Sequence, residues 1–138
     1  MLDSNVLLDI VREPHGAVAQ AFAGLDLGSV LISPVVSGEI LFGMIEKPEA
    51  RGNPRTLTLL QSLRIDAIES PADTIYGSLR LQLKLRGKGL SANDYWIAAH
   101  AMSRDAVLVT GDRAFHDAGI QNLKLQDWRA ELAVQGRN

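Results

Sequence analysis

"SVLISPVVSGEI", residues 29–40, joins a short apolar run to a segment that carries the start signals of a helix. The run SVLIS is rich in Val, Leu and Ile and is bounded by Gly28 and Ser33, as a buried strand commonly is. Ser33 followed by Pro34 combines a preferred N-cap residue with a proline in the first helical position. The stretch therefore predicts a strand over 29–33 that leads directly into a helix over 34–45.

The alternation of strand and helix signals continues along the chain. AVLVT at 106–110 is the other clear strand, and LRIDAI at 63–68 and NLKLQ at 122–126 are weaker candidates. Helical patterns cover 15–23, 34–45, 54–63, 72–85 and 92–104. Strands that are separated by helices form βαβ units, so the sequence predicts an α/β fold with a central parallel sheet and helices on both of its faces.

The segment LRLQLKLR at 79–86 is ambiguous, because its apolar and polar residues alternate with the period of a half-buried strand. We predict a helix, since Pro71 can start one and Leu, Gln, Lys and Arg are good helix formers. A strand is the alternative. In the helix, Leu81 and Leu85 lie on a face that the core of one chain does not need, and this favours a homodimer that buries them.

The composition limits the class of protein. A chain of 138 residues that is 46% hydrophobic can bury one core, so we expect a single domain over residues 1–138. Without a long apolar run or a basic amino terminus, neither a membrane span nor a signal peptide is expected, and we place the protein in the cytoplasm. The absence of cysteine excludes disulfides, cysteine-type zinc sites and thiol catalysis. A net charge of −2 argues against a duplex nucleic-acid partner, unless several carboxylates are committed to a metal.

Four acidic residues map to one edge of the predicted sheet. Asp3 follows the first residues of the chain, Glu39 lies in the helix after SVLIS, Asp94 begins a helix and Asp112 follows AVLVT. Ligands of open α/β sheets gather at the carboxyl ends of the strands. Four carboxylates that converge there would repel one another unless a cation lies among them.

Each of these acids also has a local interpretation that involves no ligand. Asp3 can cap the first helix, and Ser91 with Asp94 forms a capping box. Gly111-Asp112 is a turn signal, and Glu39 can answer the dipole of its own helix. The functional interpretation therefore depends on the coincidence of all four.

The motifs around these acids resemble those of the PIN-domain ribonucleases, and within them the toxins of VapBC-type toxin–antitoxin pairs. The matching stretches are LDSNVLLDI, SGEILFGM, GLSANDYWIAAHA and LVTGDRAF, and the trailing LKLQDW fits the family's closing strand. The resemblance implies about five parallel strands in one PIN-like domain and a Mg²⁺- or Mn²⁺-dependent endoribonuclease, with an antitoxin protein as partner. It carries over Asp3, Glu39, Asp94 and Asp112 as the acidic quartet.

Two departures from the family pattern concern the amino terminus. Ser4 stands where threonine is usual and keeps the hydroxyl group, while only Met1 and Leu2 precede Asp3, so the first strand is clipped.

The residue types indicate how such a site would work. Carboxylate oxygens are hard ligands that favour Mg²⁺ or Mn²⁺, and such an ion activates water and neutralises charge at a phosphodiester. We expect Asp3 and Asp94 to ligate directly, and Glu39 and Asp112 to act through water or at a second metal position. Ser4 and Asn5 are auxiliary candidates that hold a bound water or a phosphate oxygen, or that simply cap the first helix.

Binding of RNA requires further side chains. The candidates form a basic row near the loop that leads to Asp94: Arg80, Lys84, Arg86 and Lys88. A solvated helix face is the alternative interpretation of this row. Tyr95 and Trp96 can stack on unpaired bases, or they belong to the core or an interface. His100 and His116 are not needed as general bases if a metal activates the water.

Other enzyme and binding classes fit the sequence less well. A haloacid-dehalogenase-type phosphatase needs a second acid two residues after its first aspartate, where this chain has Asn5. A response-regulator receiver needs a lysine after a late strand, where this chain offers Asp112 and Arg113. A housekeeping nuclease of the same fold, and a PIN-fold binding module without catalysis, remain as alternatives to the toxin.

Overall fold

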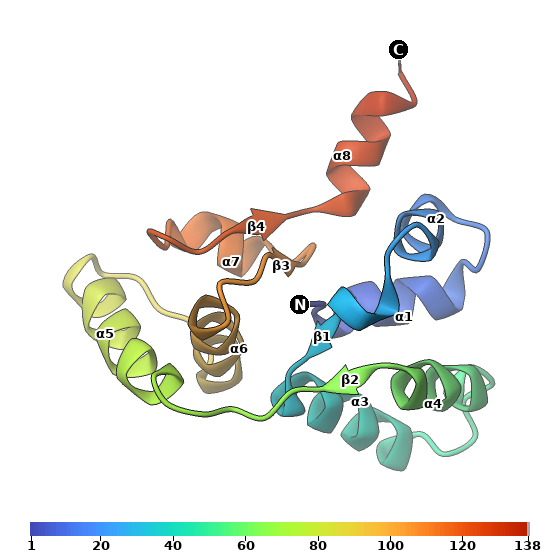
Figure 1. Ribbon diagram of the computed structural model, residues 1–138, viewed down its shortest axis with the longest axis horizontal. Coiled ribbons are helices and arrows are strands. Elements are labelled where there is room, and N and C mark those ends of the chain that lie inside the picture. The colour runs from blue at the N-terminus through green and yellow to red at the C-terminus, as the bar shows by residue number, and fades with distance from the viewer. Residues whose placement is uncertain (138) are drawn as a thin grey trace.

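A computed structural model describes residues 1–137 of the chain as a mixed fold of helices and short parallel strands (Figure 1). The helices are α1 (Ser4–Arg12), α2 (Ala17–Ala23), α3 (Pro34–Glu46), α4 (Asn53–Ser62), α5 (Ala72–Leu85), α6 (Ala92–Ser103), α7 (Arg113–Ala118) and α8 (Trp128–Gln135), with a short 3₁₀ helix over Leu27–Ser29. The strands are β1 (Leu31–Ile32), β2 (Arg64–Ile65), β3 (Leu108–Val109) and β4 (Leu125–Gln126).

The strands form two parallel pairs. β1 pairs with β2, and β3 pairs with β4. Residues 1–3 lie between the two pairs, because the Leu2 amide donates to Leu31 (3.2 Å) and the Asp3 amide donates to Val109 (3.0 Å). The predicted α/β class is confirmed. A central sheet of about five strands is not: the described residues form only these two short pairs, linked by backbone hydrogen bonds through residues 1–3.

The start of α3 is the one that the opening stretch predicts. The Ser33 side chain accepts a hydrogen bond from the Val35 amide (3.3 Å), and Pro34 occupies the first turn. Val36 and Ile40 on this helix are buried in the core. The strand–helix transition thus carries the chain from the sheet into the helix that presents Glu39.

The ambiguous segment 79–86 is helical, as we predicted, and it lies in α5. Leu79 and Leu83 are buried, whereas Leu81 and Leu85 keep 58% and 77% of their surface exposed. The helical period explains this division, because residues four apart share a face. α5 packs against α6, and Figure 1 shows the two helices side by side at one end of the molecule.

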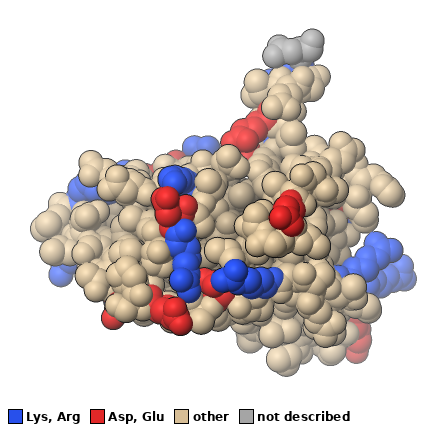
Figure 2. Space-filling view, in the orientation of Figure 1, with Lys and Arg blue, Asp and Glu red and all other residues tan. Residues whose placement is uncertain are grey.

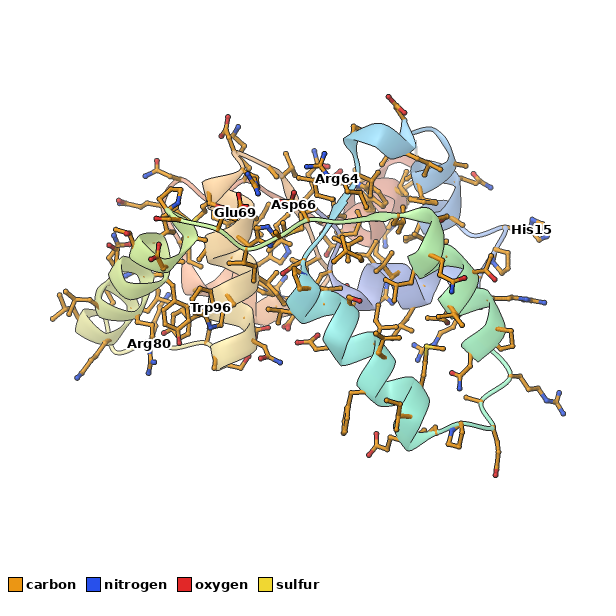
Figure 3. The ribbon with its side chains drawn as sticks, turned by 60° about the horizontal axis from the view of Figure 1, so that its bottom comes forward. His15, Arg64, Asp66, Glu69, Arg80 and Trp96 are labelled. Carbon is orange, nitrogen blue, oxygen red and sulfur yellow. The ribbon has the colours of Figure 1, made fainter. Side chains whose placement is uncertain are left out.

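A buried aspartate fixes α6 against the segment that follows β2. Asp66 is 4% exposed and accepts hydrogen bonds from Arg104 Nε (2.6 Å) and Arg64 Nη2 (2.9 Å), and its Oδ2 lies 3.0 Å from His100 Nε2. Burial opposes its ionisation, but these hydrogen bonds outweigh burial and hold the pKa of Asp66 below its ordinary value. Figure 3 shows Asp66 between Arg64 and Glu69 beside α6. α6 carries Asp94 at its other end.

One core joins the sheet to its covering helices. Its fully buried side chains include Leu2, Leu7, Ile32, Val36, Leu83, Ile97, Leu108 and Phe115. No helix among the described residues is long and apolar enough to cross a lipid bilayer.

Candidate active site

Asp3 ends the segment of residues 1–3 that lies between the two strand pairs, and it is 4% exposed. Its Oδ1 accepts a hydrogen bond from the Ser4 amide (2.8 Å), so Asp3 is the N-cap of α1, as its local interpretation predicts. Its Oδ2 accepts from the Thr110 hydroxyl (2.7 Å), and Asn5 Nδ2 lies 3.4 Å from the same oxygen. Capping and membership of an acidic site are therefore compatible at this residue.

Glu39 is held between two helices. The Ser4 hydroxyl of α1 donates to Glu39 Oε2 (3.1 Å), and Asn93 Nδ2 of α6 donates to Glu39 Oε1 (3.2 Å). Both carboxylate oxygens are thus oriented by neutral donors. Among the described residues, Glu39 forms no ion pair.

Asp94 and Asp112 each sit at the start of a helix. The Asp94 amide donates to the Ser91 hydroxyl (3.1 Å), which is one half of the predicted capping box. Asp112 caps α7 by accepting from the Ala114 amide (2.9 Å), and its own amide donates to the Thr110 hydroxyl (3.1 Å). Thr110 therefore connects Asp3 with the loop that presents Asp112.

The carboxylates influence one another electrostatically. Burial raises the pKa of Asp3 despite the hydrogen bonds from Thr110 and Ser4, and the charges of Glu39 and Asp94 raise it further. Burial also raises the pKa of Asp94, and there the charges of Asp112 and Glu39 add to the effect. Like-charge repulsion thus links all four predicted acids, which come from four separate segments of the chain.

The donor set fits a hard divalent cation. Carboxylate, hydroxyl and amide oxygens are the ligands that Mg²⁺ and Mn²⁺ prefer, and a cation would relieve the repulsion among the four acids. Among the described residues, no three or more acidic or histidine side chains form a group that could hold a metal ion. The acids therefore form a neighbourhood of like charge rather than a preassembled coordination shell.

Two polar residues of this neighbourhood have no place in the sequence-based prediction. Asn93 holds Glu39, and Thr110 holds Asp3. A signal existed for each: Asn93 directly precedes a predicted acid, and Thr110 ends a predicted strand at the same sheet edge. Their role depends on contacts across more than 50 residues, as the separations of 54 and 107 residues show, and such contacts cannot be deduced from local sequence.

A groove lies between α1, α3 and α4, and of the four acids only Glu39 lines it. It has a volume of about 280 Å³ and begins at Ser4 and Glu39. Leu8 and Met44 line its middle, and Arg12 and Lys47 lie at its other end. Glu39 thus borders a groove whose far end is basic.

The predicted basic row divides into two kinds of residue. Arg86 Nη2 donates to the Ala118 carbonyl (3.0 Å) and Lys88 Nζ donates to the Asp117 carbonyl (2.8 Å), so both bind the carboxyl end of α7. Arg80 and Lys84 lie exposed on α5. Figure 2 shows basic and acidic side chains in small groups on a largely neutral face, without a continuous basic patch.

Neither His100 nor His116 forms a hydrogen bond with one of the four acids in the described part of the chain. His100 Nε2 faces Asp66, and His116 Nε2 lies 2.9 Å from the Thr110 carbonyl oxygen.

The PIN domain family matches residues 1–121, and the chain belongs to this family. Among curated proteins, it is 30% identical to the tRNA(fMet)-specific endonuclease VapC of Shigella flexneri, with 93% of this chain and 96% of the relative covered. It is 28% identical to ribonuclease VapC2 of Rickettsia felis over the same shares. Among solved structures, VapBC2 from Rickettsia felis bound to a promoter DNA fragment has a TM-score of 0.79 at 27% identity, covering 91% of this chain and 96% of that one. FitAB bound to the IR36 DNA fragment has a TM-score of 0.78 at 26% identity, covering 92% and 93%.

Proposed function

We propose that the protein is a divalent-metal-dependent endoribonuclease that acts in the cytoplasm as the toxin of a toxin–antitoxin pair. The observation that carries the proposal is the set of hydrogen bonds and like-charge interactions that link the segments of Asp3, Glu39, Asp94 and Asp112. Burial raises the pKa of Asp3, and the charges of Glu39 and Asp94 raise it further. Relatives that are named VapC ribonucleases, and VapBC complexes with the same fold, support RNA as the substrate and a cognate antitoxin as the partner.

Asp3 and Asp94 are the proposed direct ligands, with Glu39 and Asp112 acting through water or at a second metal position. A bound Mg²⁺ or Mn²⁺ supplies an activated water and neutralises charge that develops on the phosphodiester. The Thr110 hydroxyl fixes one oxygen of Asp3, and Ser4 and Asn93 fix both oxygens of Glu39. These neutral donors orient the carboxylates without cancelling the charge that attracts the metal. Asn5 Nδ2 is within 3.4 Å of both Asp3 and Thr110, so we assign it to the support of Asp3.

The whole of residues 1–138 is proposed to work as one domain. α8 packs on α2, and Arg129 of α8 forms an ion pair with Asp9 of α1, so the segment that follows residue 121 is attached to the body that carries Asp3.

The nuclease proposal is tested by the metal dependence of RNA cleavage. The purified protein is incubated with a panel of RNAs, including tRNA, in Mg²⁺ or Mn²⁺ and in excess EDTA. We expect cleavage with either metal and none after chelation, because the four carboxylates are suited to bind a divalent metal ion and no other cofactor. Cleavage that persists undiminished in EDTA would contradict the proposal. Expression without an antitoxin is expected to arrest a bacterial host, and a housekeeping nuclease would not do so.

The exposed leucines of α5 support the predicted homodimer. Leu81→Lys places a charge on the face that the dimer would bury, so we expect the variant to sediment as a monomer at micromolar concentration while the wild type sediments as a dimer. Lys84→Gln on the same helix is the control and should remain dimeric. A wild-type protein that sediments as a monomer would remove the reason for assigning this face.

A further inference from the structure

An aromatic cluster lies where α5 packs against α6. The Tyr76 and Trp96 rings are stacked, with centroids 4.2 Å apart and an interplanar angle of 23°. Tyr95 meets Tyr76 edge-on at 5.9 Å. The chain has only two tyrosines and two tryptophans, so both tyrosines and one tryptophan gather at this one place.

Arg80 completes the cluster. Its guanidinium carbon lies 5.7 Å from the ring centroids of both Tyr76 and Tyr95, and its Nη1 donates to the Tyr76 hydroxyl (3.2 Å). Figure 3 shows Arg80 and Trp96 close together at this end of the molecule. Arg80 forms no ion pair with any carboxylate in the described part of the chain, so its charge is available to an anion.

The cluster is adjacent to the acidic site along α6. Trp96 follows Asp94 by two residues and Asn93 by three, and Asn93 holds Glu39. Residues three apart in a helix lie on the same side, about 4.5 Å apart along its axis. Trp96 therefore lies about one turn of α6 beyond the asparagine that holds Glu39.

The chemistry of the cluster suits an unpaired nucleobase. Tyr76 covers one face of the Trp96 indole, and Trp96 is partly buried, so a minor part of its surface remains accessible to solvent. Aromatic rings bind unpaired bases by stacking, and an arginine beside them adds a cation for base or phosphate. A purely structural cluster would not need an exposed arginine that forms no ion pair among the described residues.

We propose that Trp96, backed by Tyr76 and flanked by Arg80, stacks on an unpaired base next to the phosphodiester that is cleaved. This inference rests on the proposed ribonuclease function and adds a binding position for one base of the substrate. Trp96 and Arg80 are then substrate-binding residues that determine where the RNA is cut.

The test follows base stacking directly through the fluorescence of Trp96. In a Trp128→Phe background, Trp96 is the only tryptophan. We titrate this protein in EDTA, which prevents cleavage, with a single-stranded oligonucleotide of RNA and with an abasic sugar-phosphate chain of the same length. The base-bearing oligonucleotide should quench the fluorescence and bind about tenfold more tightly than the abasic one. Equal affinity without quenching overturns the inference.

Variants separate stacking from charge and from misfolding. Trp96→Leu should raise the Kd for labelled RNA about tenfold and raise KM more than it lowers kcat. Arg80→Met keeps most of the side-chain stem and should weaken binding and reduce its salt dependence, whereas Lys84→Met, one turn further on α5, should do so less. If Arg80→Met and Lys84→Met weaken binding equally, diffuse positive charge explains RNA binding without a specific site, and the inference fails.

The outcome is independent of the nuclease test. A wild-type protein that cleaves RNA with Mg²⁺ but shows no quenching contradicts the stacking site alone. A protein that is quenched by base-bearing RNA but cleaves no RNA supports the stacking site and contradicts the proposed nuclease.

Discussion

Replacing Asp94 with asparagine is expected to lower RNA cleavage about a hundredfold or more while leaving the fold intact. Asparagine has the same shape but no charge, so it cannot replace a carboxylate that ligates a divalent ion. Removing a residue that hydrogen-bonds to a metal ligand commonly lowers metal affinity or activity by 10- to about 100-fold. Removing a ligand itself should lower activity by at least the upper end of this range. The Ser91 cap should survive, because the Ser91 hydroxyl accepts from the Asp94 backbone amide, which the substitution leaves in place.

The measurement is the initial rate of RNA cleavage in saturating Mg²⁺, together with a thermal melt. Asp73→Asn is a matched control, since Asp73 is also an aspartate in the first turn of a helix but lies exposed on α5. We expect the control to cleave RNA at the wild-type rate. In the host, Asp94→Asn should relieve growth arrest and Asp73→Asn should not. Equal rates for wild type and Asp94→Asn would place the chemistry elsewhere.

Replacing Asp3 with asparagine is expected to make the metal-free protein at least as stable as the wild type and to shrink the stabilisation by Mn²⁺. Divalent cations bind only the folded site, so they stabilise the wild type by about 2.7 kcal/mol at a hundredfold excess over Kd. Without Asp3 the site holds the ion less well, and the gain is smaller. The metal-free protein loses one buried negative charge from a cluster of like charges.

The sign of the pH dependence follows from the raised pKa values. A carboxyl group whose pKa is raised by folding stabilises the fold most below its ordinary value of 3.8, and this contribution is lost as the pH rises through the higher folded pKa. Asp3 and Asp94 both act in this sense. The advantage of Asp3→Asn in the metal-free protein should therefore be largest near pH 7 and decrease towards pH 4.

A capping control separates the two roles of Asp3. Asp26 is exposed and caps the short 3₁₀ helix by accepting from the Gly28 amide (3.0 Å). Asp26→Asn should change the melting temperature little and should keep the full response to Mn²⁺. If wild type and Asp3→Asn respond identically to an Mn²⁺ titration, Asp3 is a helix cap only and the site assignment fails.

Local signals in the sequence were sufficient for most helices. Ser33-Pro34 marks the start of α3 correctly, and the choice of helix over strand for 79–86 is confirmed. The helices α7 and α8 were not predicted. Both are short, and each begins after an aspartate that caps it. Because aspartate is also a common turn residue, these caps, Asp112 and Asp127, are equally typical of turns.

Features that depend on distant parts of the chain were harder to predict. The contribution of residues 1–3 to the sheet edge depends on hydrogen bonds to Leu31 and Val109 that local sequence does not encode. Arg86 and Lys88 bind carbonyl oxygens at the end of α7, although their spacing in the sequence matches a solvent-exposed basic face equally well. The charge pattern is local, whereas the acceptor that satisfies each charge is not.

The placement of residues 1–3 between β1 and β3 also determines when the site can form during synthesis. Asp3 is translated well before its hydrogen-bond partner Thr110, which follows 107 residues later. Contacts of such sequence separation form late in folding, because a long loop must close before they are gained. Asp3 and Asp112 therefore meet only when most of the chain has left the ribosome. In a toxin of this topology, the four acids are therefore not assembled until most of the chain has been made, and an antitoxin can bind the chain as soon as it folds.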